Sequence, residues 1–195
     1  MKNEKRHPIK PYLTDDLTKL QRGAAVVLPK DFGIIVAYTG LTRDSVVAEA
    51  GTGTGFMAVQ LARIAKKVYS YENREEHYET AKLNLDRLHT DNVELRLGSI
   101  ENLDVDNLDM IFLDFKGSDA LVGKMRTHLK DGGFIVGYCP NIEQAKSFHL
   151  NAENSGYKKV FTLTTSVTDY EIREFGCRPA HFGLLHTAYL VFAKK

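Results

Sequence analysis

Residues 46–55 read Val-Val-Ala-Glu-Ala-Gly-Thr-Gly-Thr-Gly, and this segment constrains the fold more than any other part of the chain. A β-branched apolar run leads into a loop with three glycines, and an apolar pattern with helical spacing follows from Phe56. Glycine lets the backbone turn sharply and approach a ligand without a Cβ in the way. Strand, glycine-rich loop and helix in this order are typical of the first half of a nucleotide-binding βαβ unit.

The spacing of the glycines distinguishes between two kinds of cofactor. A dinucleotide site has the pattern Gly-x-Gly-x-x-Gly, whose third glycine would fall at Phe56, whereas here it comes one residue earlier, at Gly55. An acidic residue, Glu49, stands two positions before the first glycine. The pattern Glu-x-Gly-x-Gly-x-Gly resembles motif I of the class I S-adenosylmethionine (SAM) methyltransferases. We therefore expect SAM as the cofactor and S-adenosylhomocysteine as its product. A nicotinamide-dependent oxidoreductase, and glycines that only permit a tight turn, are the alternatives.

A second acidic position agrees with this interpretation. Residues 67–71 read as the next strand, and Glu72 closes it about 20 residues after the glycine loop, where an acidic side chain can accept hydrogen bonds from both ribose hydroxyls of a nucleoside. Ser99 stands where methyltransferases often carry an aspartate toward the adenine amine. The residues expected to bind the cofactor are Glu49, Gly51, Thr52, Gly53, Gly55, Glu72, Asn73, Ser99, Ile100 and Asp114.

The rest of the chain alternates between the two types of secondary structure. The length of 195 residues suggests one methyltransferase domain over 1–195, in which 1–27 form an N-terminal arm with a short helix near 16–21. Strands are predicted at 45–50, 67–71, 93–97, 109–114 and 133–138, and helices at 30–38, 55–66, 74–89, 118–129 and 141–155. Two further strand-like segments, 157–165 and 186–193, flank an irregular stretch and suggest a hairpin-like pair at one sheet edge. The pattern predicts an α/β, Rossmann-like, doubly wound and mainly parallel seven-stranded sheet. Class I methyltransferases end such a sheet with an antiparallel strand.

The composition and the N-terminal residues indicate in which cellular compartment the protein is expected. No apolar run approaches the roughly 18 residues of a membrane span, and the first residues lack the apolar segment of a secretory signal. Cys139 and Cys177 form neither a metal-ligand pair nor a disulfide framework, so no metal site is expected. A cytoplasmic protein with no membrane partner is the default expectation. The net charge of +1 provides no overall basic field for nucleic acid.

Asp114 is the candidate catalytic residue. The apolar strand 109–114 ends in this carboxylate, and ligands of open α/β sheets bind beyond the carboxyl ends of the strands. Methyl transfer from a sulfonium depends mainly on positioning and on stabilising the charge that develops on the acceptor. If the acceptor is a purine ring nitrogen, the product is cationic, and a carboxylate near the exocyclic amine offsets that charge. The alternative is an aspartate that caps the following helix or turn.

A basic and aromatic cluster lies near the C-terminus. The candidate substrate-binding residues are Arg173, Arg178, His181 and His186, in the irregular stretch before the last strand. Basic and aromatic side chains in a loop suit phosphate contacts and base stacking. The alternative is a solvated loop in which His186 is satisfied by its own sheet.

From about Leu28 onward, about five-sixths of the chain resembles the tRNA adenine-N1 methyltransferase family. The matching segments are Pro29-Lys-Asp31, motif I over 49–55, Ser70-Tyr-Glu-Asn-Arg74, 92–98, Leu113-Asp114, Tyr138-Cys-Pro-Asn-Ile-Glu-Gln144, and Arg178-Pro179 with His186-Thr187. The resemblance implies methylation of adenine N1 in the T-arm of tRNA. It also implies tRNA as a partner and a homo-oligomer, either a dimer or a tetramer.

The chain departs from that family in its acceptor half. Only about 27 residues precede the matched region, too few for the family's N-terminal β-barrel-like domain. Leu28 replaces a tyrosine, and the segment 115–120 lacks the Pro-Trp pair that follows the catalytic aspartate in the family. Two alternatives therefore stay open: a methyltransferase of the same fold that acts on a small molecule or a protein, and a non-catalytic SAM-binding subunit.

Overall fold

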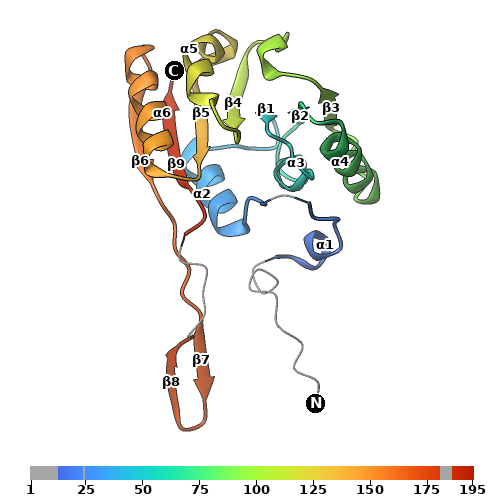
Figure 1. The fold of residues 1–195 in the computed structure, drawn as a ribbon, viewed down its shortest axis with the longest axis vertical. Coiled ribbons are helices and arrows are strands. Elements are labelled where there is room, and N and C mark those ends of the chain that lie inside the picture. Colours follow the sequence, from blue (N-terminus) through green and yellow to red (C-terminus); the bar gives the residue numbers. More distant parts are fainter. Residues whose placement is uncertain (1–12, 24, 181–185) are drawn as a thin grey trace.

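One seven-stranded sheet organises the computed structural model, which describes residues 13–23, 25–180 and 186–195 (Figure 1). The strand order is β3-β2-β1-β4-β5-β9-β6. The strands are β1 (Val46–Ala50), β2 (Lys67–Glu72), β3 (Val93–Leu97), β4 (Leu108–Leu113), β5 (Leu129–Cys139), β6 (Lys158–Leu163) and β9 (Tyr189–Lys194). Neighbouring pairs from β3 to β5 are parallel, whereas β9 runs antiparallel to both β5 and β6. The predicted α/β, doubly wound sheet with an antiparallel last strand is confirmed.

Helices cover both faces of this sheet (Figure 1). They are α1 (Asp15–Thr18), α2 (Pro29–Thr39), α3 (Phe56–Ala62), α4 (Glu75–Arg87), α5 (Val122–Met125) and α6 (Ile142–Asn154), with short 3₁₀ turns η2 (Ile100–Asn102), η3 (Ser118–Leu121) and η4 (Arg126–His128). Alternate residues of a strand point to opposite faces. In β4, Phe112 accordingly packs in the cluster of α2 and α3, while Ile111 packs in that of α5 and α6. Within the described ranges, none of the helices combines the length and the apolar character needed to cross a membrane.

The prediction of one helix over 118–129 was wrong. The segment forms η3, α5 and η4 in succession, and β5 already begins at Leu129. Gly123 lies inside α5, between the two 3₁₀ turns, so its low helix propensity does not explain the division. A Cβ at Gly123 would lie 3.0 Å from Ser155 Oγ, so the glycine permits close packing against the end of α6.

The two C-terminal strands pair as predicted, but part of the described stretch between them forms two further strands. β6 and β9 form an antiparallel pair, with β6 at the edge of the sheet. Between them, β7 (Tyr170–Arg173) and β8 (Gly176–Pro179) form a separate two-stranded hairpin that projects from the body of the molecule (Figure 1). Each strand has only four residues, which is too short for a period of two to stand out from a loop.

Candidate cofactor and active site

The glycine loop after β1 is pressed against the end of β4. Gly51 has a φ of +85°, and a Cβ there would lie 2.0 Å from the carbonyl oxygen of Asp114. The backbone N–H of Asp114 donates to the carbonyl of Ala50 at 2.9 Å. Gly55 also has a positive φ, of 84°, at the residue before α3. The loop therefore requires glycine for both its conformation and its close contact with Asp114.

Glu72 closes β2 and fixes the same loop from the other side. The Gly53 N–H donates to Glu72 Oε2 at 2.7 Å, and the Arg74 N–H donates to Oε1 at 3.0 Å. The side chain is almost fully buried. Oε1 also accepts a hydrogen bond from Arg74 Nε at 3.4 Å, whereas Oε2 can accept a second one, so Glu72 keeps acceptor capacity for a ligand.

Glu49 lies behind the loop and not at its surface. Its side chain is fully buried, and the Ser70 hydroxyl donates to Oε1 while bonding to Thr52 Oγ1 at 2.6 Å. Oε2 has no hydrogen-bond partner among the described residues. Burial raises the pKa of Glu49 to about 7. Glu49 thus supports the motif I loop through Ser70 and Thr52 from inside the sheet.

A cavity of about 400 Å³ opens where β1, β2, β3 and β4 end. It is lined by Ala50, Gly51, Tyr71, Glu72, Asn73, Arg74, Gly98, Ser99, Ile100, Asp114, Phe115 and Lys116. Six of the predicted cofactor residues line this cavity: Gly51, Glu72, Asn73, Ser99, Ile100 and Asp114. The remaining four lie outside this lining, namely Glu49, Thr52, Gly53 and Gly55. The cavity lies at the carboxyl edge of the parallel strands, where ligands of such sheets bind.

The wall after β3 is shaped by a short turn. The Ser99 hydroxyl accepts a hydrogen bond from the Glu101 N–H at 3.2 Å and so caps η2. The hydroxyl proton of Ser99 can still be donated. The Ile100 side chain is buried, and it provides an apolar surface beside this polar group.

Of the two carboxylates that line the cavity, Asp114 and Glu72, Asp114 has fewer hydrogen bonds. Within the described part of the chain its side chain makes no hydrogen bond or ion pair, and the following 3₁₀ turn has Gly117 at its N-cap position without a side-chain cap. Asp114 therefore does not cap the following turn, which was the alternative to a catalytic role. Burial raises the pKa of Asp114 to about 7. A carboxylate in such surroundings gains from a hydrogen-bond donor or a cation supplied by a ligand.

Sequence reasoning missed a buried polar network below the cavity. Asp31 is fully buried and accepts hydrogen bonds from Lys30 Nζ at 2.7 Å, Thr187 Oγ1 at 2.7 Å and the Tyr138 hydroxyl at 3.2 Å. Thr165 contacts both members of the Lys30–Asp31 pair. The network joins the start of α2 to the ends of β5, β6 and β9. The sequence feature that could have indicated this network is the adjacent Lys30-Asp31 pair in the first turn of an otherwise mainly apolar helix.

Comparison with known proteins identifies the family. The sequence profile of the tRNA methyltransferase complex GCD14 subunit matches residues 16–184. The chain belongs to this family. A TrmI from Thermus thermophilus, described as a tRNA (adenine(58)-N(1))-methyltransferase, is 30% identical over 192 residues, covering 95% of this chain and 75% of the relative.

Solved structures agree with the family and the fold. The tRNA (m1A58) methyltransferase TrmI from Aquifex aeolicus superimposes with a TM-score of 0.85 at 25% identity, covering 92% of this chain and 73% of the other. A SAM-dependent O-methyltransferase from Thermotoga maritima gives a TM-score of 0.87 at 26% identity, covering 93% and 70%. Lys30 and Asp31, which lie within the matched residues, meet Thr187, which follows them, in the buried polar network.

The predicted substrate residues of this family member are not gathered at the cavity. Arg173 and Arg178 lie on the projecting hairpin, where both pair with Glu171, and Arg178 Nε donates to it at 3.0 Å. His186 is exposed, and its ring centroid lies 4.8 Å from that of Tyr189. The fourth residue, His181, lies outside the described residues.

Proposed function

We propose that this chain is a SAM-dependent methyltransferase that methylates N1 of adenine in tRNA. Membership of the GCD14 family supports the reaction class, and the named activities of the TrmI relatives support the acceptor. The observation that carries the proposal is the unpaired, half-buried carboxylate of Asp114 beside the glycine loop at the cavity. We place this activity in the cytoplasm, and we assign it to a single domain over 1–195.

The cavity residues fit the cofactor in three respects. Gly51 lets the loop lie directly against the Asp114 backbone at the cavity, Glu72 Oε2 can accept a hydrogen bond from a ribose hydroxyl, and Ser99 with Ile100 offers a polar and apolar wall for an adenine ring. When bound, SAM supplies an electrophilic methyl group on a cationic sulfonium. The buried carboxylates Glu49, Glu72 and Asp114 around the loop oppose that positive charge.

Asp114 has two roles in the proposed reaction. It accepts a hydrogen bond from the exocyclic amine of the target adenine and so directs N1 toward the methyl group. The N1 lone pair forms the new N–C bond, the C–S bond breaks with its electrons on sulfur, and the positive charge passes to the base. The Asp114 carboxylate stabilises the charge that develops on the base, which is where fixed electrostatic groups have their largest effect on rate.

The test is transfer of labelled methyl from SAM to unmodified tRNA, with the product mapped as N1-methyladenosine. Asp114→Ala should lower the rate at least about 100-fold, the usual scale for removing one such group. Its affinity for SAM should change less than about tenfold. The matched control is Asp106→Ala, which removes an exposed carboxylate that pairs with His128 of η4 and lies outside the cavity lining. An undiminished rate in Asp114→Ala would contradict the assigned role.

A second candidate acceptor is a small molecule or a protein side chain. The similar Thermotoga maritima structure is described as an O-methyltransferase, and Phe115 with Lys116 stands at the cavity in place of the expected Pro-Trp pair. Parallel assays with tRNA and with a nuclease-treated cell extract separate the two acceptors. Label only in the treated extract would favour the second candidate, and label in neither would favour the non-catalytic SAM-binding subunit.

A further inference from the structure

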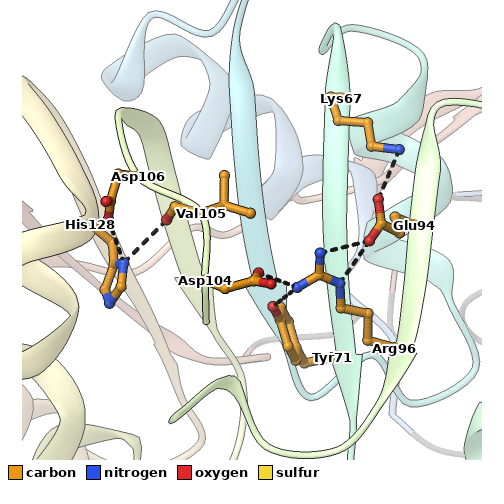
Figure 2. Close-up of polar contacts among 8 residues, drawn as sticks. All are labelled: Lys67, Tyr71, Glu94, Arg96, Asp104, Val105, Asp106 and His128. Atoms are coloured by element: carbon orange, nitrogen blue, oxygen red, sulfur yellow. Dashed lines mark hydrogen bonds and ion pairs between the residues drawn. The ribbon is translucent and has the colours of Figure 1, made fainter. Parts of the chain in front are cut away.

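Arg96 on β3 stands beside the cavity without lining it, and all three of its guanidinium nitrogens are engaged (Figure 2). Nε and Nη2 contact Glu94 Oε1 at 2.8 and 2.6 Å. Nη1 donates to the Tyr71 hydroxyl at 2.6 Å and to Asp104 Oδ1 at 2.5 Å. The planar fork of a guanidinium holds three partners in one fixed arrangement, which an ammonium cannot reproduce.

The hydrogen bond from Arg96 to the Tyr71 hydroxyl fixes one wall of the cavity. Tyr71 lines the cavity, is buried, and directly precedes Glu72 at the end of β2. The Arg96 guanidinium also lies 5.4 Å from the centroid of the Tyr71 ring, within the range of a cation–π contact. Arg96 therefore holds the Tyr71 ring both at its hydroxyl and near its face.

The contact of Arg96 with Asp104 reaches the segment that follows the Ser99–Ile100 wall. Asp104 lies just after η2, whose residue Ile100 lines the cavity together with Ser99. The hydrogen bond from Arg96 holds the pKa of Asp104 below its usual value, so the carboxylate is ionised at neutral pH. The segment after Ser99 is tied to β3 through this contact.

The far end of that segment has a separate attachment. His128 Nδ1 lies 2.8 Å from Asp106 Oδ1 and 3.1 Å from the carbonyl oxygen of Val105 (Figure 2). Lys124 Nζ also donates to the carbonyl of Glu101 at 2.7 Å. These contacts join the segment to η4 and α5. The Gly98 N–H, which donates to the Glu72 carbonyl at 2.8 Å, holds the start of the segment to β2 through the backbone. Among the described side chains, Arg96 connects Asp104, after η2, to Tyr71.

We propose that Arg96 is a positioning residue for the cofactor, which sets the separation between the Tyr71–Glu72 wall and the Ser99–Ile100 wall of the cavity. The inference rests on the proposed use of SAM, and it adds a residue that contacts neither the cofactor nor the acceptor. Its effect is on the affinity for the adenosine part of SAM and not on the methyl-transfer step.

Binding of SAM and of S-adenosylhomocysteine to the full chain, measured by calorimetry, tests this role. Arg96→Ala should weaken both affinities at least about tenfold, and Arg96→Lys should recover only part of the loss because it lacks the fork. Tyr71→Phe and Asp104→Ala each remove one of these two hydrogen bonds from Arg96 and should each give a smaller loss than Arg96→Ala. The control His128→Ala removes the contacts with Val105 and Asp106 and should change the affinity for SAM less than about twofold.

Steady-state kinetics separate positioning from a general loss of structure. Arg96→Ala should raise the KM for SAM while kcat at saturating SAM stays within about twofold of the wild type. Unfolding in urea without SAM shows how much of each variant is folded. Wild-type affinity in a folded Arg96→Ala variant would overturn the inference alone, whereas a wild-type chain that binds no SAM would overturn the proposed cofactor and the inference with it.

Discussion

At the scale of single residues, Gly51 sets how closely the loop after β1 approaches the backbone of Asp114. Gly51→Ala would bring a Cβ to 2.0 Å from a carbonyl oxygen at a φ of +85°, so the loop would have to move. We expect a loss of about 2–4 kcal/mol in unfolding free energy and at least a tenfold weaker affinity for SAM. The control is Gly33→Ala in α2, where nothing lies within 4 Å and alanine is the better helix former. Equal behaviour of the two variants in urea unfolding would contradict the assigned constraint.

Glu49 makes the stability of the ligand-free protein depend on pH. Its pKa is raised from 4.5 to about 7, so between these values the folded state holds a proton that the unfolded chain releases. The unfolding free energy therefore falls as pH rises through this range, by about 3 kcal/mol from this group. Glu49→Gln cannot ionise and keeps an acceptor for Ser70, so it should remove this part of the decrease. Urea unfolding between about pH 4.5 and pH 8.5 checks the difference between the two proteins, which should grow with pH. A difference independent of pH would count against the prediction.

At the scale of elements, the Lys30–Asp31 pair attaches α2 to the ends of three strands. Asp31→Ala would leave the buried Lys30 ammonium, whose Nζ lies 2.7 Å from Asp31 Oδ1, without its counter-charge. The expected loss is about 3–5 kcal/mol of unfolding free energy. Asp16→Ala breaks the exposed pair with Arg63, at 3.2 Å, and should cost less than about 1 kcal/mol. Chemical denaturation of both variants measures the two decreases in unfolding free energy. Similar decreases would refute the structural role of the Lys30–Asp31 pair.

The elements also show which features can be read from sequence. β1, the glycine loop and β2 were predictable because their signals are local: an apolar run, then residues whose φ requires glycine. Six predicted cofactor residues line one cavity for the same reason, since parallel strands end at a common edge. The division of 118–128 into η3, α5 and η4 was not predicted, and the contact of Gly123 with Ser155 at the end of α6 joins residues far apart in the sequence.

The contacts that organise the surroundings of the cavity could not be predicted in this way. Arg96 meets Tyr71, 25 residues away, and Asp31 meets Thr187, 156 residues away. Such pairs carry no periodicity, and only the assembled sheet brings them together. Arg173 and Arg178 were predicted from their basic character to bind substrate, and that role stays a prediction. Their position on the β7–β8 hairpin could not be read from the sequence.

At the scale of the whole molecule, the β7–β8 hairpin exposes apolar side chains far from the sheet. Phe175 is 98% exposed and Ile172 75% exposed. A hairpin alone is marginally stable in water, so we expect a second copy of the chain to cover this surface. Phe175→Ser with Ile172→Ser should shift the native mass toward the monomer in light scattering. The control Leu83→Ser changes an exposed apolar residue on α4 and should leave the mass unchanged. A wild-type monomer, or an oligomer that survives the double substitution, would contradict this expectation.

The position of β9 has a consequence for the order of assembly. β9 follows β6 in the chain but lies between β5 and β6 in the sheet. β6 therefore has no backbone partner until residues 189–194 have been synthesised, and the strand edges of β5 and β6 stay open while the earlier strands can already pair. A nascent chain stopped before β9 would hold the glycine loop, Glu72 and Asp114 on a half-finished sheet, exposed to aggregation. Pairing of residues 189–194 with β5 and β6, and not formation of the glycine loop, then completes the sheet.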